Sequence, residues 1–237
     1  MRAVICDGRI SPDMERGLQK YGYYLIKLPP LSSLPEGISS HPDTLIFKLD
    51  NIFVTTCDYA EGSAYVFSDI REFCTNSQLF FVDEMLGKSY PTDALLNAVN
   101  FGKHLMANQK TVSKKILEIA KNQGLTVKNV NQGYPNCSIL KLNDENAITS
   151  DAGIYRALVD IGVNALLIEP GNISLPPYAY GFIGGASGVD GDKAFFLGDL
   201  GSHPEGEKIK EFIEELGMKA ISLSGEPLAD LGGLIFI

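Results

Sequence analysis

The chain of 237 residues contains no long hydrophobic run. Its longest apolar stretches, such as Ala165–Ile168 and Leu234–Ile237, have the length of a single strand. A membrane-spanning helix needs about 20 apolar residues, so we expect no membrane partner. The first ten residues, MRAVICDGRI, also lack the apolar core and the small-residue cleavage site of a secretory signal. We therefore expect a cytoplasmic protein.

Cysteine is scarce and basic residues are outnumbered by acidic ones. The four cysteines (Cys6, Cys57, Cys74 and Cys137) lack the spacing of a metal site and are too few for a disulfide scaffold. The net charge of −9 and the pI near 4.8 argue against a nucleic-acid partner. No phosphate-binding loop or Gly-x-Ser-x-Gly motif is present, so we expect neither a metal nor a cofactor.

An internal repeat organises what is present. The segment HPDTLIFKLDNIFVT from His41 aligns with YPNCSILKLNDENAIT from Tyr134. In both segments a proline is followed by small or polar residues and then by an apolar run that contains a lysine. Looser copies begin at Tyr90, Pro176 and Glu226. A repeat of this length indicates several copies of one supersecondary unit.

The interior of the unit is predicted to be strand–strand–helix–strand. Each expected helix opens at a residue that can cap its first turn, namely Ser11, Thr111, Ser150 or Ser202. Ser202 and Glu205 also have the spacing of a capping box. Each helix is expected to stop at a glycine, namely Gly22, Gly124, Gly162 or Gly217, and a short strand follows. The copy that begins at His41 is irregular, because residues 57–74 show only a weak helical pattern.

These units account for nearly the whole chain as a single domain. The expected units are 41–89, 90–133, 134–175 and 176–225, with the fifth formed by 226–237 together with 1–40. The anchoring prolines are Pro42, Pro91, Pro135, Pro177 and Pro227. Because the C-terminal segment supplies a first strand and the N-terminal segment supplies the rest, the two ends should pair and close a ring. Closure would remove the sheet edges that invite aggregation.

Five such units resemble the pentein fold, the α/β propeller of the guanidine-group-modifying superfamily. The resemblance covers nearly the whole chain at the level of the repeat and implies a five-fold pseudo-symmetric ββαβ propeller, here in a divergent branch. The superfamily includes arginine and agmatine deiminases, dimethylargininases and amidinotransferases. It also includes non-catalytic members, notably a ribosome anti-association factor.

One local motif supports the resemblance. Enzymes of the superfamily carry His-x-Asp-Thr before an apolar strand, which matches His41-Pro42-Asp43-Thr44. The resemblance implies that His41 is the general acid/base and that Asp43 helps to hold the substrate. The nucleophile of the superfamily is a cysteine after a glycine-rich run near the C-terminus, but the run here, LGGLIFI, contains none. A simple turn at residues 41–44 remains the alternative.

Cys137 is the candidate for a displaced nucleophile. It follows its anchoring proline at the mouth of a strand, and equivalent positions of a ring face one central opening. His41, Asp43, Asp93 and Cys137 would then converge from three consecutive units. A cysteine beside a histidine can form a thiolate nucleophile with its acid/base partner. The alternative is a small buried side chain, which is the commonest fate of a free cysteine.

Two further segments are candidate parts of the site. Gly184 and Gly185, in GFIGGASG, would let the backbone approach the ring centre or a ligand closely. Asp199 and His203 precede a predicted helix, where an anion can bind, although His203 with Pro204 could simply start that helix.

Two functions remain open from the sequence. The first is binding of a small polar ligand, with a cationic guanidino or amidino compound favoured by the acidic residues at the opening. If the protein is an enzyme, Cys137 attacks the amidino carbon, His41 moves protons, and Asp43 and Asp93 hold the cation. The second is a non-catalytic pentein that binds a protein or ribosomal partner. A lowered pKa of Cys137 would favour the enzyme, and a large exposed apolar patch would favour the interface. The sequence does not predict the oligomeric state.

Overall fold

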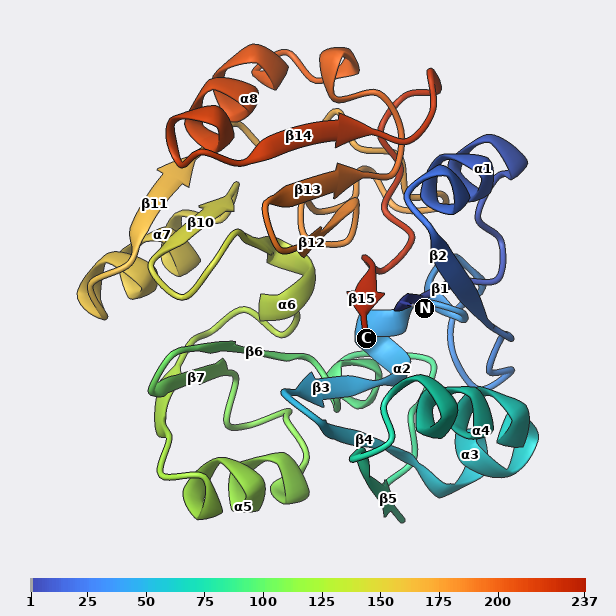
Figure 1. Ribbon diagram of the computed structural model, residues 1–237. Helices are drawn as coiled ribbons and strands as arrows, with labels where there is room; N and C mark the ends of the chain where they lie inside the picture. The colour runs from blue at the N-terminus through green and yellow to red at the C-terminus, as the bar shows by residue number, and fades with distance from the viewer. Residues whose placement is uncertain (1) are drawn as a thin grey trace.

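The computed structural model describes residues 2–237, which form five three-stranded sheets around a common centre (Figure 1). In every sheet the first strand pairs antiparallel with the second, and the second pairs parallel with the third. A helical segment connects the second and third strands in each case. The predicted five-fold ββαβ propeller is therefore confirmed.

The elements are as follows. One unit, a sheet together with its connecting helix, consists of β15 (Ile235–Phe236), β1 (Arg2–Asp7), α1 (Pro12–Lys20) and β2 (Tyr23–Leu28). The next holds β3 (Phe47–Leu49), β4 (Ile52–Thr56), α3 (Cys57–Gly62), α4 (Ala64–Phe73) and β5 (Gln78–Val82). The third holds β6 (Ala98–Phe101), β7 (His104–Ala107), α5 (Lys114–Asn122) and β8 (Thr126–Asn129). The fourth holds β9 (Ile139–Lys141), β10 (Asn146–Thr149), α7 (Ala152–Asp160) and β11 (Asn164–Leu167). The fifth holds β12 (Ser187–Asp190), β13 (Lys193–Phe196), η3 (Leu200–Ser202), α8 (Gly206–Glu215) and β14 (Lys219–Ser222).

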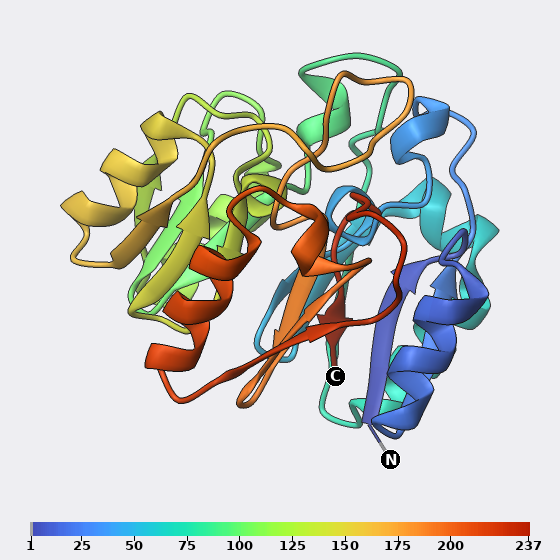
Figure 2. The same cartoon turned by 90° about the horizontal axis from the view of Figure 1, so that it is seen from above.

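The two ends of the chain complete one sheet. Strand β15 pairs antiparallel with β1, with Val4 opposite Phe236 and Ile5 opposite Ile235. Aromatic packing extends the junction to the fifth sheet, since the ring of Phe195 lies 5.3 Å from that of Phe236. Seen from above, β1 and β15 lie side by side, and the loops before β6 (green) and β12 (orange) meet at the opposite end of the molecule (Figure 2). The predicted pairing of the two termini is confirmed.

Local sequence explains most helix ends. Ser11 caps α1 by accepting a hydrogen bond from the backbone N–H of Met14 at 3.4 Å. All four predicted glycine stops have the left-handed backbone that favours glycine, and they are Gly22, Gly124, Gly162 and Gly217.

Three predicted helix starts are displaced. The cap of α5 is Ser113, and the cap of α7 is Asp151, whose carboxylate accepts from two backbone N–H groups. The expected capping box of Ser202 and Glu205 is wrong, because α8 starts only at Gly206. Asp199 instead caps the short η3 by accepting from the N–H of Gly201. An Asp carboxylate that bonds the backbone competes with the hydroxyl as a cap.

Residues 57–74 form two helices, α3 and α4, although their local pattern is weak. Helix α4 buries Val66, Phe67 and Ile70, and the ring of Phe73 stacks on Tyr24 at 5.0 Å. Packing against the neighbouring sheet therefore stabilises a helix that its own sequence favours only weakly.

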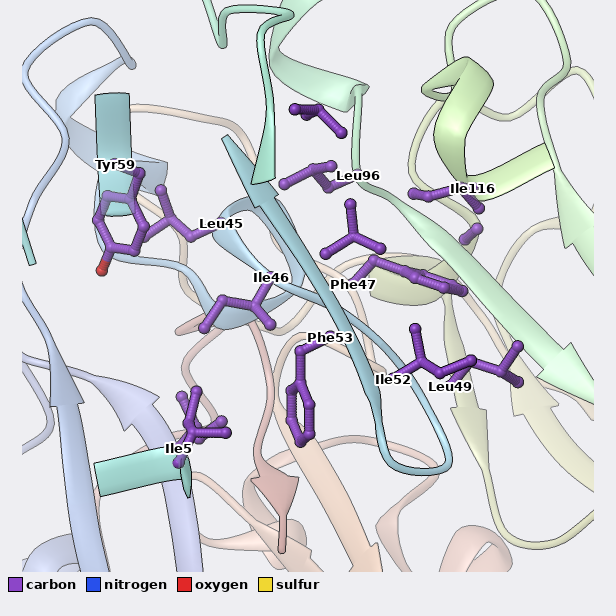
Figure 3. Close-up of a cluster of buried hydrophobic side chains, with 14 of the residues drawn as sticks. Ile5, Leu45, Ile46, Phe47, Leu49, Ile52, Phe53, Tyr59, Leu96 and Ile116 are labelled. Atoms are coloured by element: carbon purple, nitrogen blue, oxygen red, sulfur yellow. The ribbon is translucent and has the colours of Figure 1, made fainter. Parts of the chain in front are cut away.

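The largest hydrophobic cluster joins the first three sheets (Figure 3). Its labelled members are Ile5, Leu45, Ile46, Phe47, Leu49, Ile52, Phe53, Tyr59, Leu96 and Ile116. Because these side chains come from separate units, each unit buries its apolar face only beside its neighbours. None of the helices within residues 2–237 combines the length and the apolar composition that crossing a membrane requires.

Short helices precede three of the first strands. Pro42 and Pro135 open α2 (Pro42–Leu45) and α6 (Pro135–Ser138), and Pro91 precedes η2 (Thr92–Ala94). The anchoring role does not hold at Pro177 and Pro227, which lie in loops well before β12 and β15. In these loops glycines replace the short helix, because a glycine backbone needs less space near the centre of the ring than a helical turn does.

The glycine-rich C-terminal run fills the centre of the ring. The backbone N–H of Asp43 donates to the carbonyl of Gly232 at 3.1 Å, and the N–H of Gly233 donates to the carbonyl of Gly185 at 2.7 Å. A Cβ at Gly232 would lie 2.3 Å from the Cβ of His41. The run therefore connects α2 with the fifth sheet, and only glycine fits against His41.

Two alanine substitutions separate backbone strain from this close contact. Gly217 and Gly232 have nearly equal φ angles of 73° and 71°, but a Cβ at Gly217 would meet nothing within 4 Å. We expect Gly217→Ala to lower the free energy of unfolding by about 1–2 kcal/mol through strain alone. Gly232→Ala should cost about 1–3 kcal/mol more, because His41 must move. Urea denaturation measures both values, and equal losses would show that the C-terminal run packs loosely.

Candidate functional site

A cavity of about 550 Å³ opens at the end of the ring where the short helices lie. Its walls include His41, Asp93, Cys137 and Asp230, and we call it the thiol cavity. Four tyrosines provide much of the remaining wall, and they are Tyr90, Tyr134, Tyr178 and Tyr180. Buried polar groups and aromatic walls in one concave site are typical of small-molecule binding.

Equivalent positions of three consecutive units bring the candidate residues together. His41 is the N-terminal cap of α2, Asp93 lies in η2, and Cys137 lies in α6. Each of these segments leads directly into the first strand of its sheet. The His-x-Asp-Thr segment is thus a helical turn in its local structure, and it also presents His41 to the cavity.

Cys137, in the wall of the thiol cavity, is held in place by two polar partners. Its thiol lies 2.6 Å from Oδ2 of Asp43, to which it donates, and it accepts from Nδ2 of Asn97 at 3.3 Å. Burial raises the pKa of Cys137 well above its usual value, and the nearby charge of Asp43 raises it further. The cysteine is therefore a neutral thiol in the ligand-free protein, which is the opposite of the lowered pKa that would identify a resting nucleophile.

Asp43 lies beside the thiol and does not line the thiol cavity. It borders a separate cavity of about 140 Å³ on the far side of Cys137. Burial, with a contribution from Asp230, raises the pKa of Asp43 well above its usual value. In this position Asp43 contacts the thiol of Cys137 directly, whereas the lining of the thiol cavity does not include it.

His41 lies between two carboxylates that come from the first sheet and the C-terminal run. Its Nε2 is 3.9 Å from Oδ2 of Asp7, and its Nδ1 is 3.7 Å from Oδ1 of Asp230. Burial lowers the pKa of His41, although both carboxylates oppose this effect. Nε2 has no hydrogen-bond partner within residues 2–237. A neutral imidazole with a free nitrogen is suited to accept or transfer a proton.

Both carboxylates beside His41 have other partners. Arg9 contacts Asp7 through Nε and Nη2, with the shortest distance 2.6 Å, and so balances its charge. Asp230 accepts from the backbone N–H groups of Phe182 and Gly232. Burial raises the pKa of Asp230, while His41 lowers it.

Asp93 is the least satisfied group of the cavity. It is buried, and its Oδ1 has no hydrogen-bond partner within the described residues. Burial and the adjacent Asp93 raise the pKa of Tyr134, so this phenol remains protonated. Oδ1 is therefore an acceptor that a ligand could satisfy.

The other candidate residues lie outside the thiol cavity. A Cβ at Gly184 would lie 2.4 Å from the carbonyl oxygen of Asn136, and one at Gly185 would lie 2.0 Å from Oδ1 of Asp230. These glycines therefore permit close packing at the ring centre. Asp199 caps η3, and Nδ1 of His203 accepts from the N–H of Glu205, so both serve their own turn.

The sequence did not point to Asp7, Asn97 or Asp230. Asp230 stands immediately before the glycine-rich run that the superfamily resemblance marked as functional, and this position was an available signal. Asp7 and Asn97 reach the site through tertiary contacts, since Asn97 bonds Cys137 across 40 residues of the chain.

Comparison with known proteins identifies the family of this chain. A family model described as "Family of unknown function (DUF6873)" matches residues 5–235. The chain belongs to this family. No curated protein sequence matches it.

Solved structures of the pentein superfamily share the fold. A dimethylarginine dimethylaminohydrolase from Pseudomonas aeruginosa, in complex with citrulline, is 11% identical with a TM-score of 0.56, over 94% of this chain and 92% of that chain. An amidinotransferase from Microseira wollei is 9% identical with a TM-score of 0.58, over 98% and 93%. An agmatine deiminase from C. jejuni is 8% identical with a TM-score of 0.54, over 94% and 87%. This chain therefore has the pentein fold.

The shifted pKa values of Asp43 and His41 predict opposite effects of pH on stability. Asp43 keeps its proton above the ordinary pKa of 3.8 in the folded protein, so ionisation of the unfolded chain costs stability as pH rises. His41 stays neutral below the ordinary pKa of 6.5, so stability is lost as pH falls below that value.

We therefore expect Asp43→Asn to gain free energy of unfolding relative to the unmodified protein as pH rises from 5 to 8. His41→Asn should instead gain relative stability as pH falls from 7 to 5. Urea denaturation across this pH range measures both trends. An offset that is independent of pH in both variants would contradict the assigned shifts.

Proposed function

We propose that the thiol cavity binds a small cationic guanidino or amidino compound and that Cys137 attacks its amidino carbon. The observation that carries the proposal is the meeting of a thiol, a neutral histidine and two buried carboxylates in one cavity. These are the groups that a reaction at a planar cation requires, namely a nucleophile, a proton carrier and counter-charges.

The carboxylates favour a cationic ligand. Oδ1 of Asp93 lacks a hydrogen-bond donor, and a guanidinium or amidinium group would supply one from its N–H edge. The tyrosine walls offer ring faces to the same delocalised cation. A neutral ligand would leave the buried carboxylate of Asp93 without a neighbouring positive charge.

A bound cation also provides a route to the reactive thiolate. A positive charge beside Cys137 stabilises its ionised form, so ligand entry would lower a pKa that burial has raised. The thiol proton passes to His41, and a bond forms between Sγ and the amidino carbon. The C–N bond to the leaving amine then breaks as this amine takes the proton from His41. Water completes a hydrolase cycle, whereas a second amine completes a transferase cycle.

Charged and neutral alkylating agents test this dependence on a cation. We expect chloroacetamidine to label Cys137 at least about tenfold faster than the neutral chloroacetamide, because the amidinium group binds near Asp93 and activates the thiol. Peptide mass spectrometry gives the rate at each cysteine. The less buried Cys57 serves as an internal control that should show no such preference.

Two variants assign the roles. Asp93→Asn should remove the preference of Cys137 for the cationic reagent, and His41→Asn should slow its labelling without removing the preference. Equal labelling of Cys137 by both reagents in the unmodified protein would reject the proposed cation site. A panel of guanidino compounds then tests turnover directly.

A non-catalytic binding protein is the second candidate. The raised pKa of Cys137 favours it, and so do Tyr90, Tyr178 and Tyr180 at the cavity, which are 53%, 44% and 44% exposed. Exposed tyrosines are common in protein interfaces. In that case guanidino compounds would give no thiol adduct and no turnover, and substituting these tyrosines would reduce capture of a protein or ribosomal partner.

A further inference from the structure

A second cavity, of about 500 Å³, involves the far ends of the first strands. The segments before β3, β6 and β9 line the thiol cavity, whereas the end of β3, the end of β6 and the end of β9 line this one. We call it the lysine cavity, because Lys48 and Lys141 face it. The proposed chemistry of the thiol cavity uses none of these groups.

The sheet register places one equivalent side chain from each of four sheets at this cavity. The four lie near the hairpin end of the first strand, and they are Lys48 opposite Phe53, Asn100 opposite Leu105, Lys141 opposite Ala147 and Val189 opposite Ala194. Lys141 forms the last pair of its ladder, and the other three lie one step before the last pair. Phe236 of β15 adds the fifth sheet. Side chains at matching positions of matching strands point to the same side, so the ring gathers them. Three consecutive sheets supply a polar group here.

Lys48 has no carboxylate partner. Its Nζ forms no ion pair within residues 2–237, although it lies 6.0 Å from the ring centre of Phe53. Burial lowers the pKa of Lys48, the charges of Asp50 and Cys74 oppose this effect, and the charge of Lys141 adds to it. Both lysines line the same cavity. Lys141 is partly balanced by Asp144 at 2.6 Å. An unpaired lysine in a recess is costly unless an anion completes it.

Asn100 adds an unpartnered polar group. Its Oδ1 is buried and has no hydrogen-bond partner within residues 2–237. An oxyanion requires a donor, so Asn100 can bond it only after its amide turns to present Nδ2 instead of Oδ1. The acidic residues of the cavity are Asp50 and Asp144, and both lie at exposed hairpins. Asp144 is already committed to Lys141, and the Asp50 charge only partly offsets the effect of burial on Lys48.

We propose that the lysine cavity binds a small oxyanion, a carboxylate or a phosphate, between Lys48 and Lys141. The anion accepts charge-assisted hydrogen bonds from both ammonium groups and removes their repulsion. Nδ2 of Asn100, with its amide turned, donates to the anion from the third sheet, and Val189 and Phe236 line the apolar side. This site is separate from the thiol cavity and stands whether or not Cys137 is catalytic.

Thermal unfolding of the full chain tests the site with two probes, inorganic phosphate and succinate. Sodium chloride at matched ionic strength corrects for screening. We expect at least one probe to raise Tm above the chloride value, because a ligand that binds only the folded state stabilises it. The probe that acts identifies the anion as phosphate or carboxylate. Calorimetry then gives the Kd.

Variants of Lys48 test whether the anion binds in the lysine cavity. Lys48→Met keeps the aliphatic stem and should weaken binding about tenfold or more, since it removes a charge-assisted hydrogen bond. Lys48→Arg should retain binding. Lys210→Met is the matched control, because this exposed lysine lies on the outer helix α8 and its loss should leave Kd unchanged.

A measurement on the unmodified protein makes the test independent of the variants' folding. The ¹³C shift of Lys48 Cε reports its ionisation, and the bound anion should raise its pKa. The proposal is overturned if neither probe stabilises the protein beyond chloride. It is equally overturned if Lys48→Met binds as tightly as the unmodified protein, or if the Lys48 titration is unchanged by the anion.

Discussion

The contact between the glycine-rich C-terminal run and α2 is the constraint on which the rest of the structure depends. Strand β15 pairs with β1, and Gly232 packs on His41 so closely that no side chain fits between them. The run thereby closes the ring and also delivers Asp230 to the imidazole. The same few residues therefore pair the two ends of the chain and supply a carboxylate to the site.

Closure concentrates carboxylates in a buried space, and the protein compensates each of them differently. Asp7 is paired with Arg9, Asp230 receives two backbone N–H groups, and Asp43 takes a hydrogen bond from the thiol of Cys137. Of these four carboxylates, only Asp93 has an oxygen without a hydrogen-bond partner within residues 2–237. Burial keeps the thiol protonated and the imidazole neutral, so the site lacks a charged nucleophile until another charge arrives. An incoming cation would both satisfy Asp93 and favour the thiolate, which links recognition to reactivity.

The repeat explains how much of this arrangement the sequence could predict. Proline, cap and glycine signals are local, and they were sufficient for the ββαβ units and for placing His41, Asp93 and Cys137 at equivalent positions. Local signals failed where packing decides, as in α3 and α4, and where a carboxylate replaces a hydroxyl cap, as at Asp199. Asp7, Asn97 and Asp230 could not be assigned from spacing, because their neighbours at the site lie far away in the chain.

The short helix α6 contributes a residue to each of the two cavities. Cys137 faces the thiol cavity, while the preceding residue, Asn136, lines the lysine cavity. The backbone N–H of Asn136 donates to Oδ1 of Asn97 at 2.7 Å, and Nδ2 of Asn97 donates to the thiol. Because α6 is a single turn whose backbone carbonyl groups lie close to Gly184, one tightly packed segment positions a residue of each cavity.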